Sequence, residues 1–121
     1  MISSKTHAVL DYLVGILLIA APWLLGFADN SAATTIPVVL GISTLVYSLF
    51  TNYEYSLARM LPFKIHLTID FMAGLLLLAS PWLFGFHEEV YLPHVIVGAF
   101  EILAVLMTRK APSIVHKPKQ V

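Results

Sequence analysis

The sequence predicts an all-α membrane protein with four transmembrane helices, formed by two parallel two-helix repeats. Composition is the first indication: of 121 residues, 59% are hydrophobic and 12% are charged, whereas soluble domains have roughly 45–50% and about 25%. Four apolar stretches are the second, each close to the ~20 residues that span a bilayer as a helix. The third is a motif that occurs twice.

The repeated motif runs from His7 to Phe27 and returns 59 positions later, from His66 to Phe86. Eleven positions are identical, and seven of them carry the motif: a His, an Asp, a Gly, a Pro, a Trp, a second Gly and a Phe. Such a duplication predicts that both copies fold alike and present the same face inward. Each copy is followed by one further apolar stretch, so each repeat begins and ends on the same side of the membrane.

The four predicted helices span about 7–27, 36–53, 66–86 and 92–109. Polar residues and prolines separate them, as expected for turns. We divide the chain into a first repeat (1–58), a second repeat (59–110) and a basic tail (111–121), which we expect to be disordered.

Basic residues predict the orientation. All seven lie before the first helix, between the second and third, or after the fourth: Lys5, Arg59, Lys64, Arg109, Lys110, Lys117 and Lys119. The positive-inside rule therefore places both termini in the cytoplasm, and we predict a multi-pass protein of a bacterial inner membrane. Because the repeats are parallel rather than inverted, the pattern weakly disfavours an alternating-access carrier.

Small and polar residues fall on one face of every predicted helix, at steps of three or four. The packing or kink positions are Gly15, Pro22 and Gly26 in the first helix and Gly74, Pro81 and Gly85 in the third. The polar candidates for this inner face are His7, Asp11, Thr44, His66, Asp70 and Glu101. We expect Trp23 and Trp82 to anchor the helices at the outer headgroups.

Ala21-Pro22-Trp23 and Ser80-Pro81-Trp82, each with His, Asp and Gly upstream and Gly-Phe downstream, resemble the SPW-repeat family of small bacterial membrane proteins. The resemblance covers nearly the whole chain. The first copy has Ala21 where the family motif has Ser, so the hydroxyl cannot be essential in both copies. The resemblance implies the four-helix architecture and no particular biochemical activity.

The two His/Asp pairs are the leading candidates for chemistry. The spacing of His7 to Asp11, and of His66 to Asp70, places each pair on one helix face. If the first and third helices touch, the two pairs can converge. Three interpretations stay open: a structural role that fixes the register of the two halves, proton handling, or a low-ranked Zn²⁺ or Mn²⁺ site.

Glu101 is the second candidate, because a carboxyl near the middle of a bilayer is costly unless it is protonated or partnered. Its counterpart in the first repeat is Thr44. Partners proposed from helix position are Thr44, Tyr47 and Ser48 on the second helix, or His94 on its own face. A structural hydrogen bond, a proton relay and a polar ligand site are all compatible with this position.

Other function classes lack support. There is no Cys, the formal net charge is zero, and no nucleotide-binding or hydrolase motif occurs. We therefore expect no enzymatic activity, no cofactor and no nucleic-acid partner. The favoured role is a structural or accessory subunit in the lipid bilayer, packed in a homo-oligomer or with other membrane proteins. The alternatives are a small proton or cation transporter or channel, and a membrane metal-binding protein.

Overall fold

The computed structural model describes residues 2–29, 31–51, 53 and 56–108. It contains four helices: α1 (Ser4–Leu24), α2 (Ala32–Leu49), α3 (Phe63–Leu83) and α4 (Leu92–Leu106). The described residues contain no β-strand, which confirms the predicted all-α class. The tail (111–121), with Arg109 and Lys110, lies outside the described residues.

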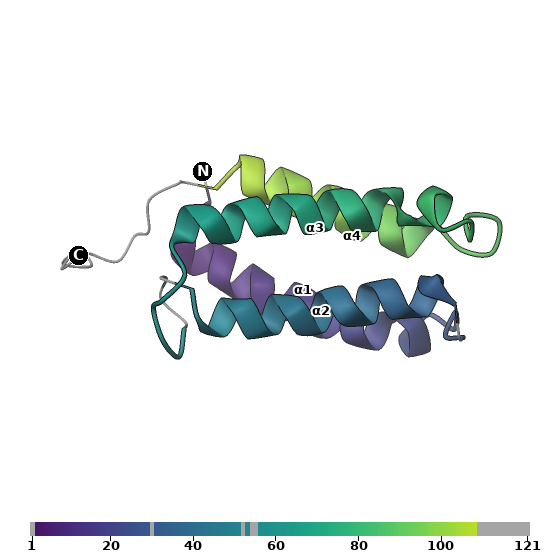
Figure 1. Cartoon of the computed structure of the whole chain (residues 1–121), viewed down its shortest axis with the longest axis horizontal. Coiled ribbons are helices and arrows are strands. Elements are labelled where there is room, and N and C mark those ends of the chain that lie inside the picture. The colour runs from purple at the N-terminus through teal and green to yellow at the C-terminus, as the bar shows by residue number, and fades with distance from the viewer. Residues whose placement is uncertain (1, 30, 52, 54–55, 109–121) are drawn as a thin grey trace.

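The helices form two antiparallel hairpins, α1 with α2 and α3 with α4, which lie one above the other (Figure 1). Helices α1 and α3 begin at the same end of the bundle, so the two repeats are parallel, as predicted. We call this the basic end, because Lys5, Arg59 and Lys64 lie there. The opposite, acidic end carries Asp29, Glu88 and Glu89.

Helices α1 and α3 begin and end about three residues earlier than the sequence predicted. Helix α1 begins early because Ser3 caps it: the Ser3 hydroxyl accepts a hydrogen bond from the Thr6 amide at 3.2 Å. Both helices end before a glycine with positive φ, 77° at Gly26 and 75° at Gly85.

Gly26 and Gly85 therefore do not act as the helix-packing positions that the sequence suggested. A Cβ at either would meet nothing within 4 Å. Instead, the amide of the following Phe donates to the carbonyl five residues back, Phe27 to Pro22 and Phe86 to Pro81, both at 2.8 Å. This is the Schellman arrangement, which favours glycine because it requires a left-handed backbone.

The helix backbones meet within each hairpin at a glycine pair, Gly15 with Gly41 and Gly74 with Gly98. A Cβ added to Gly41 would lie 2.7 Å from the Gly15 carbonyl oxygen, and one added to Gly98 would lie 2.8 Å from that of Gly74. Small residues allow this close approach between helices in lipid. The packing role predicted for Gly15 and Gly74 is thus the one that the structure gives them.

The prolines Pro22 and Pro81 are buried in the last turns of α1 and α3. Because Pro81 has no N–H, it cannot bond the carbonyl of Leu77, four residues before it. The Ser80 hydroxyl donates to that carbonyl instead, at 2.7 Å. Ala21, the corresponding residue of the first repeat, has no hydroxyl. The substitute hydrogen bond to the free carbonyl is therefore possible only in the second repeat.

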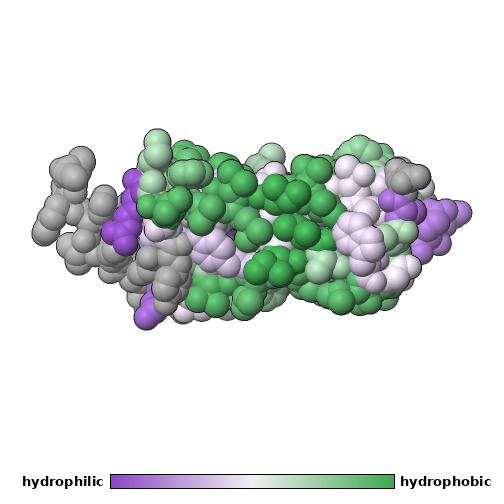
Figure 2. Space-filling model, turned by 90° about the horizontal axis from the view of Figure 1, so that it is seen from below, coloured by the Kyte–Doolittle hydropathy of each residue, from purple (hydrophilic) through white to green (hydrophobic). Residues whose placement is uncertain are grey.

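The surface matches a bilayer environment. A broad apolar zone lies between two polar ends (Figure 2), and α1, α2 and α3 are long and apolar enough to cross a membrane. Helix α4 has 15 residues and ends at Leu106, so it is shorter than predicted and spans about 22 Å. Trp23 and Trp82 are 63% and 55% exposed near the acidic end, compatible with anchoring in the headgroups.

Candidate functional site: a buried His/Asp cluster between the hairpins

The two predicted His/Asp pairs come together where α1 faces α3. His7, Asp11, His66 and Asp70, which we call the His/Asp cluster, are each at most 2% exposed. Helical spacing places each Asp one turn after its His, on the side of the helix that faces the other hairpin. The cluster lies near the basic end, in the first turns of both helices.

The shortest contacts cross from one repeat to the other. His7 Nε2 lies 2.8 Å from Asp70 Oδ2, and His66 Nε2 lies 2.7 Å from Asp11 Oδ2. The contacts within one helix are longer, 3.2 Å for His7 with Asp11 and 3.0 Å for His66 with Asp70. The cluster thus joins the hairpins more directly than it joins neighbours on a helix.

The other ring nitrogen of each imidazole, Nδ1, forms a hydrogen bond with a threonine of the opposite repeat. His7 Nδ1 lies 2.9 Å from Thr108 Oγ1, and His66 Nδ1 lies 2.6 Å from Thr51 Oγ1. Both threonine hydroxyls donate their single proton to a backbone carbonyl four residues earlier. Each threonine oxygen must therefore accept, so both Nδ1 atoms carry a proton and donate it.

Two tyrosine hydroxyls donate further hydrogen bonds to the carboxylates of the cluster. The Tyr47 hydroxyl donates to Asp70 Oδ1, and the Tyr53 hydroxyl donates to Asp11 Oδ2 at 3.0 Å. One further proton lies in each crossed contact between an imidazole Nε2 and a carboxylate. Whichever atom of each contact holds that proton, the four side chains together have no net charge, which lowers the cost of burying them in lipid.

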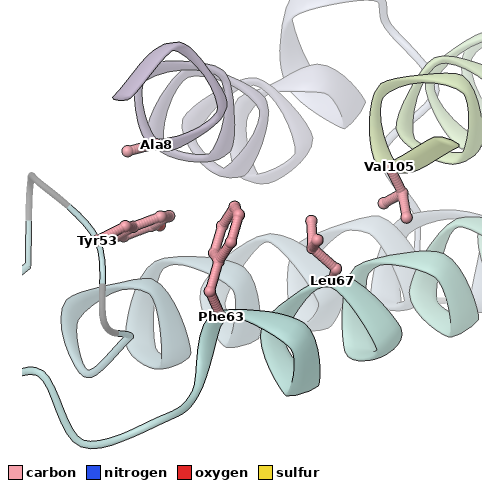
Figure 3. Packing of buried hydrophobic residues seen from close by; sticks show 5 residues of the cluster. All are labelled: Ala8, Tyr53, Phe63, Leu67 and Val105. Carbon is pink, nitrogen blue, oxygen red and sulfur yellow. The ribbon is translucent and has the colours of Figure 1, made fainter. Parts of the chain in front are cut away.

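A group of buried, mainly apolar side chains adjoins the cluster. Ala8, Tyr53, Phe63, Leu67 and Val105 pack together there (Figure 3). The Phe63 ring lies 6.1 Å from the His66 ring, nearly parallel to it, and 5.8 Å from the His7 ring. This packing contributes to the burial of the cluster, whose four residues are at most 2% exposed.

Glu101 and Thr44 are also buried, at 6% and 2% exposed. Glu101 packs against α3 at Gly74, where an added Cβ would lie 3.1 Å from the Glu101 Cβ. Among the described residues, no hydrogen bond involves the Glu101 carboxyl. His94, one of its suggested partners, instead donates from Nε2 to the Ala33 carbonyl at 2.8 Å. Among the described residues, the suggested bonds of Glu101 to Thr44, Tyr47, Ser48 and His94 are therefore all absent, and His94 bonds the α2 backbone instead.

The acidic end has an apolar interior. His94 lies between the rings of Phe27 and Phe86, at 5.3 and 4.8 Å. Val14, Leu18 and Leu77 form a second buried apolar group, and Leu18 and Leu77 line a small cavity together with His94. This apolar layer lies between His94 and the His/Asp cluster.

Sequence reasoning missed part of the site. Thr51 and Thr108 correspond to each other in the sequence, 57 positions apart near the ends of the second and fourth helices, but their positions do not identify them as partners of the histidines. Tyr53 lies in the connection between α2 and α3, and no periodicity marks a connection residue as a hydrogen-bond donor. The correspondence of Thr51 with Thr108 was the one signal that pointed toward these partners.

The fold and the cluster define a class: a multi-pass membrane protein of two parallel helical hairpins joined by buried polar side chains. The model of the SPW repeat domain matches residues 5–108, so the chain belongs to the SPW repeat family. No curated protein and no solved structure matches the chain. The predicted family membership is thereby confirmed.

Proposed function

We propose that the protein is a structural or accessory subunit of a bacterial inner membrane, without catalytic activity, in which the His/Asp cluster clamps the two hairpins together. The observation that carries this proposal is the use of the cluster's polar atoms. Both imidazoles and both carboxylates bond across the two repeats, and apolar residues cover them. A clamp needs such saturation, whereas a site that turns over substrate needs access.

The charge distribution supports an orientation with the basic end in the cytoplasm. Lys5, Arg59 and Lys64 lie at that end, while Asp29, Glu88 and Glu89 lie at the other. Cytoplasmic loops of membrane proteins are enriched in Lys and Arg. Labelling of Lys64 by an impermeant amine reagent in intact cells would contradict this orientation.

Helix α4 supports an association with further copies or with other membrane proteins. Its 15 residues span less than the ~30 Å hydrocarbon core, and oligomerisation is one response to such a mismatch. Its outer face is apolar, with Ile96, Phe100 and Leu103 between 42% and 61% exposed. A neighbouring helix on this face would shield the short segment from the mismatch.

The proposal is tested by extraction in mild detergent followed by native mass spectrometry, with cross-linking in intact membranes as a second measurement. We expect a defined oligomer or a stoichiometric complex with another membrane protein. We also expect the doubly substituted Asp11→Asn, Asp70→Asn protein to lose stability but to keep the same partners. A single copy without bound protein in both measurements would overturn the subunit role.

A proton or cation pathway is the alternative that this structure supports less well. The apolar layer of Val14, Leu18 and Leu77 interrupts the buried polar groups between His94 and the cluster. We therefore expect no proton flux above that of empty vesicles, and no difference between the wild type and Glu101→Gln. Flux that Glu101→Gln abolishes, with the fold intact, would favour the pathway over the clamp.

A further inference from the structure

We propose that the His/Asp cluster binds one divalent transition-metal ion of the Zn²⁺ type. The ligands are Nε2 of His7 and of His66 and one carboxylate oxygen each of Asp11 and Asp70. This inference goes beyond the structural role and needs no partner subunit. The question is what joins the four side chains: the two protons of the crossed contacts, or one metal ion that replaces both protons.

The geometry fits a four-coordinate ion. One ligand atom from each residue can be chosen so that all lie within 4.8 Å of one another. A tetrahedral ion with bonds of ~2.0–2.1 Å holds its ligand atoms roughly 3.4 Å apart. The nitrogen–oxygen contacts measure 2.7 to 3.2 Å; both contacts of Asp70 use Oδ2, whereas Asp11 contacts His7 through Oδ1 and His66 through Oδ2. To hold the ion, these contacts must lengthen slightly, and any ligand pair near the 4.8 Å limit must move closer together.

The surrounding hydrogen bonds hold the ligands in the state that a metal requires. Thr51 and Thr108 accept from Nδ1, so each imidazole directs Nε2 into the cluster. Tyr47 and Tyr53 donate to the carboxylates, which orients their remaining oxygens. Metal-binding histidines typically bond their second nitrogen to a fixed oxygen in this manner, and ligating carboxylates are likewise hydrogen-bonded.

The charges balance. With protons, the cluster holds two Nδ1–H groups and one proton in each crossed contact, and its net charge is zero. Binding of M²⁺ breaks the two crossed contacts and releases those two protons to water. Two neutral imidazoles, two carboxylates and M²⁺ again sum to zero. Because the total charge is unchanged, the exchange adds no net charge to the apolar interior.

The residue types match zinc rather than a hard cation. Imidazole nitrogen and carboxylate oxygen are both zinc ligands, and closed sites with four protein ligands are typical of structural zinc. Magnesium and calcium prefer sites built from oxygen alone. The burial of the four ligands and their apolar cover favour such a closed structural site.

The test uses the whole chain in detergent, stripped of metal with a chelator and then incubated with Zn²⁺. After removal of excess ion we expect about one equivalent per chain, and a higher midpoint of thermal unfolding than in the stripped protein. Substitution by Co²⁺ should produce the intense visible absorption of a four-coordinate site. Less than a tenth of an equivalent, or the spectrum of six-coordinate Co²⁺, would overturn the proposal.

A matched pair of variants separates this site from adventitious binding. Thr51→Val removes the acceptor of His66 Nδ1, and we expect it to weaken Zn²⁺ binding about 10- to 100-fold. Thr68→Val is the control: Thr68 is exposed on α3 and also donates to the carbonyl four residues back, at 3.0 Å. Equal affinity in both variants would contradict the inference.

If Thr51→Val fails to fold, the metal content and the Co²⁺ spectrum of the wild type still decide the matter. The outcome is also independent of the proposed subunit role. A metal-free protein that forms a stoichiometric complex would remove this inference alone. A metal-bound protein that has no partner would remove the subunit role alone.

Discussion

The contacts within each hairpin and the contacts between the hairpins differ in kind. Within a hairpin the helix backbones touch at paired glycines, Gly15 with Gly41 and Gly74 with Gly98. Between the hairpins, buried imidazoles, carboxylates and hydroxyls bond to one another near the basic end. Glycine packing depends on shape, and the polar contact depends on exact pairing. Loss of a single polar partner should therefore cost more than a small change of shape.

The largest effect is expected for Asp70→Ala, which leaves His7 and Tyr47 without their shared acceptor. Removal of one partner of a buried pair typically costs about 3–5 kcal/mol. We expect a decrease of that order in the free energy of unfolding, measured by denaturant titration in mixed micelles. Glu88→Ala, at the exposed acidic end, should change it little. Equal effects of the two substitutions would show that the cluster does not hold the hairpins together.

Gly98→Ala should have the next largest effect. Its Cβ would lie 2.7 Å from the Leu78 amide nitrogen, so α3 and α4 must separate. Overpacking costs typically 1–3 kcal/mol. Leu103→Ala, on the lipid-facing side of α4, is the control and should cost less. A neutral Gly98→Ala would mean that the hairpin tolerates a wider separation than the glycine pair suggests.

Gly85→Ala tests backbone conformation without a steric clash. Nothing lies within 4 Å of the added Cβ, yet φ is 75°. A left-handed residue with a side chain costs roughly 1–2 kcal/mol. Gly85→Asn should lose less, since Asn adopts this conformation more readily. The same unfolding titration compares the two, and equal losses would argue against the backbone explanation.

The smallest effect is expected for Ser80→Ala, which removes the hydroxyl that satisfies the Leu77 carbonyl. A single hydrogen bond contributes about 0.5–1.5 kcal/mol. Ala21→Ser in the first repeat is the reciprocal change and should stabilise α1 by a similar or smaller amount. If Ser80→Ala is neutral, the serine of the motif has no structural role in this chain.

The sequence predicted the fold in most respects, because the duplicated motif and the apolar lengths constrain helix number and direction. It did not predict the helix ends well. Hydropathy extends through Gly26-Phe27 and Gly85-Phe86, although the left-handed glycines end the helices there. At the other end, the cap at Ser3 lies outside the apolar stretch, so hydropathy alone missed the first turn of α1.

For the site, helical spacing predicted which residues share a face but not which partner each one takes. That His7 bonds Asp70 more closely than Asp11 depends on the rotation of α1 relative to α3, which no periodicity encodes. The contribution of Tyr53 depends on the path of a connection. Glu101 was correctly placed inside the bundle, but the described residues show no hydrogen bond between it and His94, which bonds the Ala33 carbonyl.

The crossed pairing has a consequence for how the chain arose. Each half brings one imidazole, one carboxylate and one threonine, and bonds those of the other half, as the two subunits of a symmetric dimer do. An unfused ancestor of one hairpin could thus complete the same centre by pairing with itself. The two halves nevertheless differ at corresponding positions: Glu101 aligns with Thr44, and Ala104 aligns with Tyr47. Two separate chains, each carrying one half, should then associate and form the same four-helix bundle when they are expressed together.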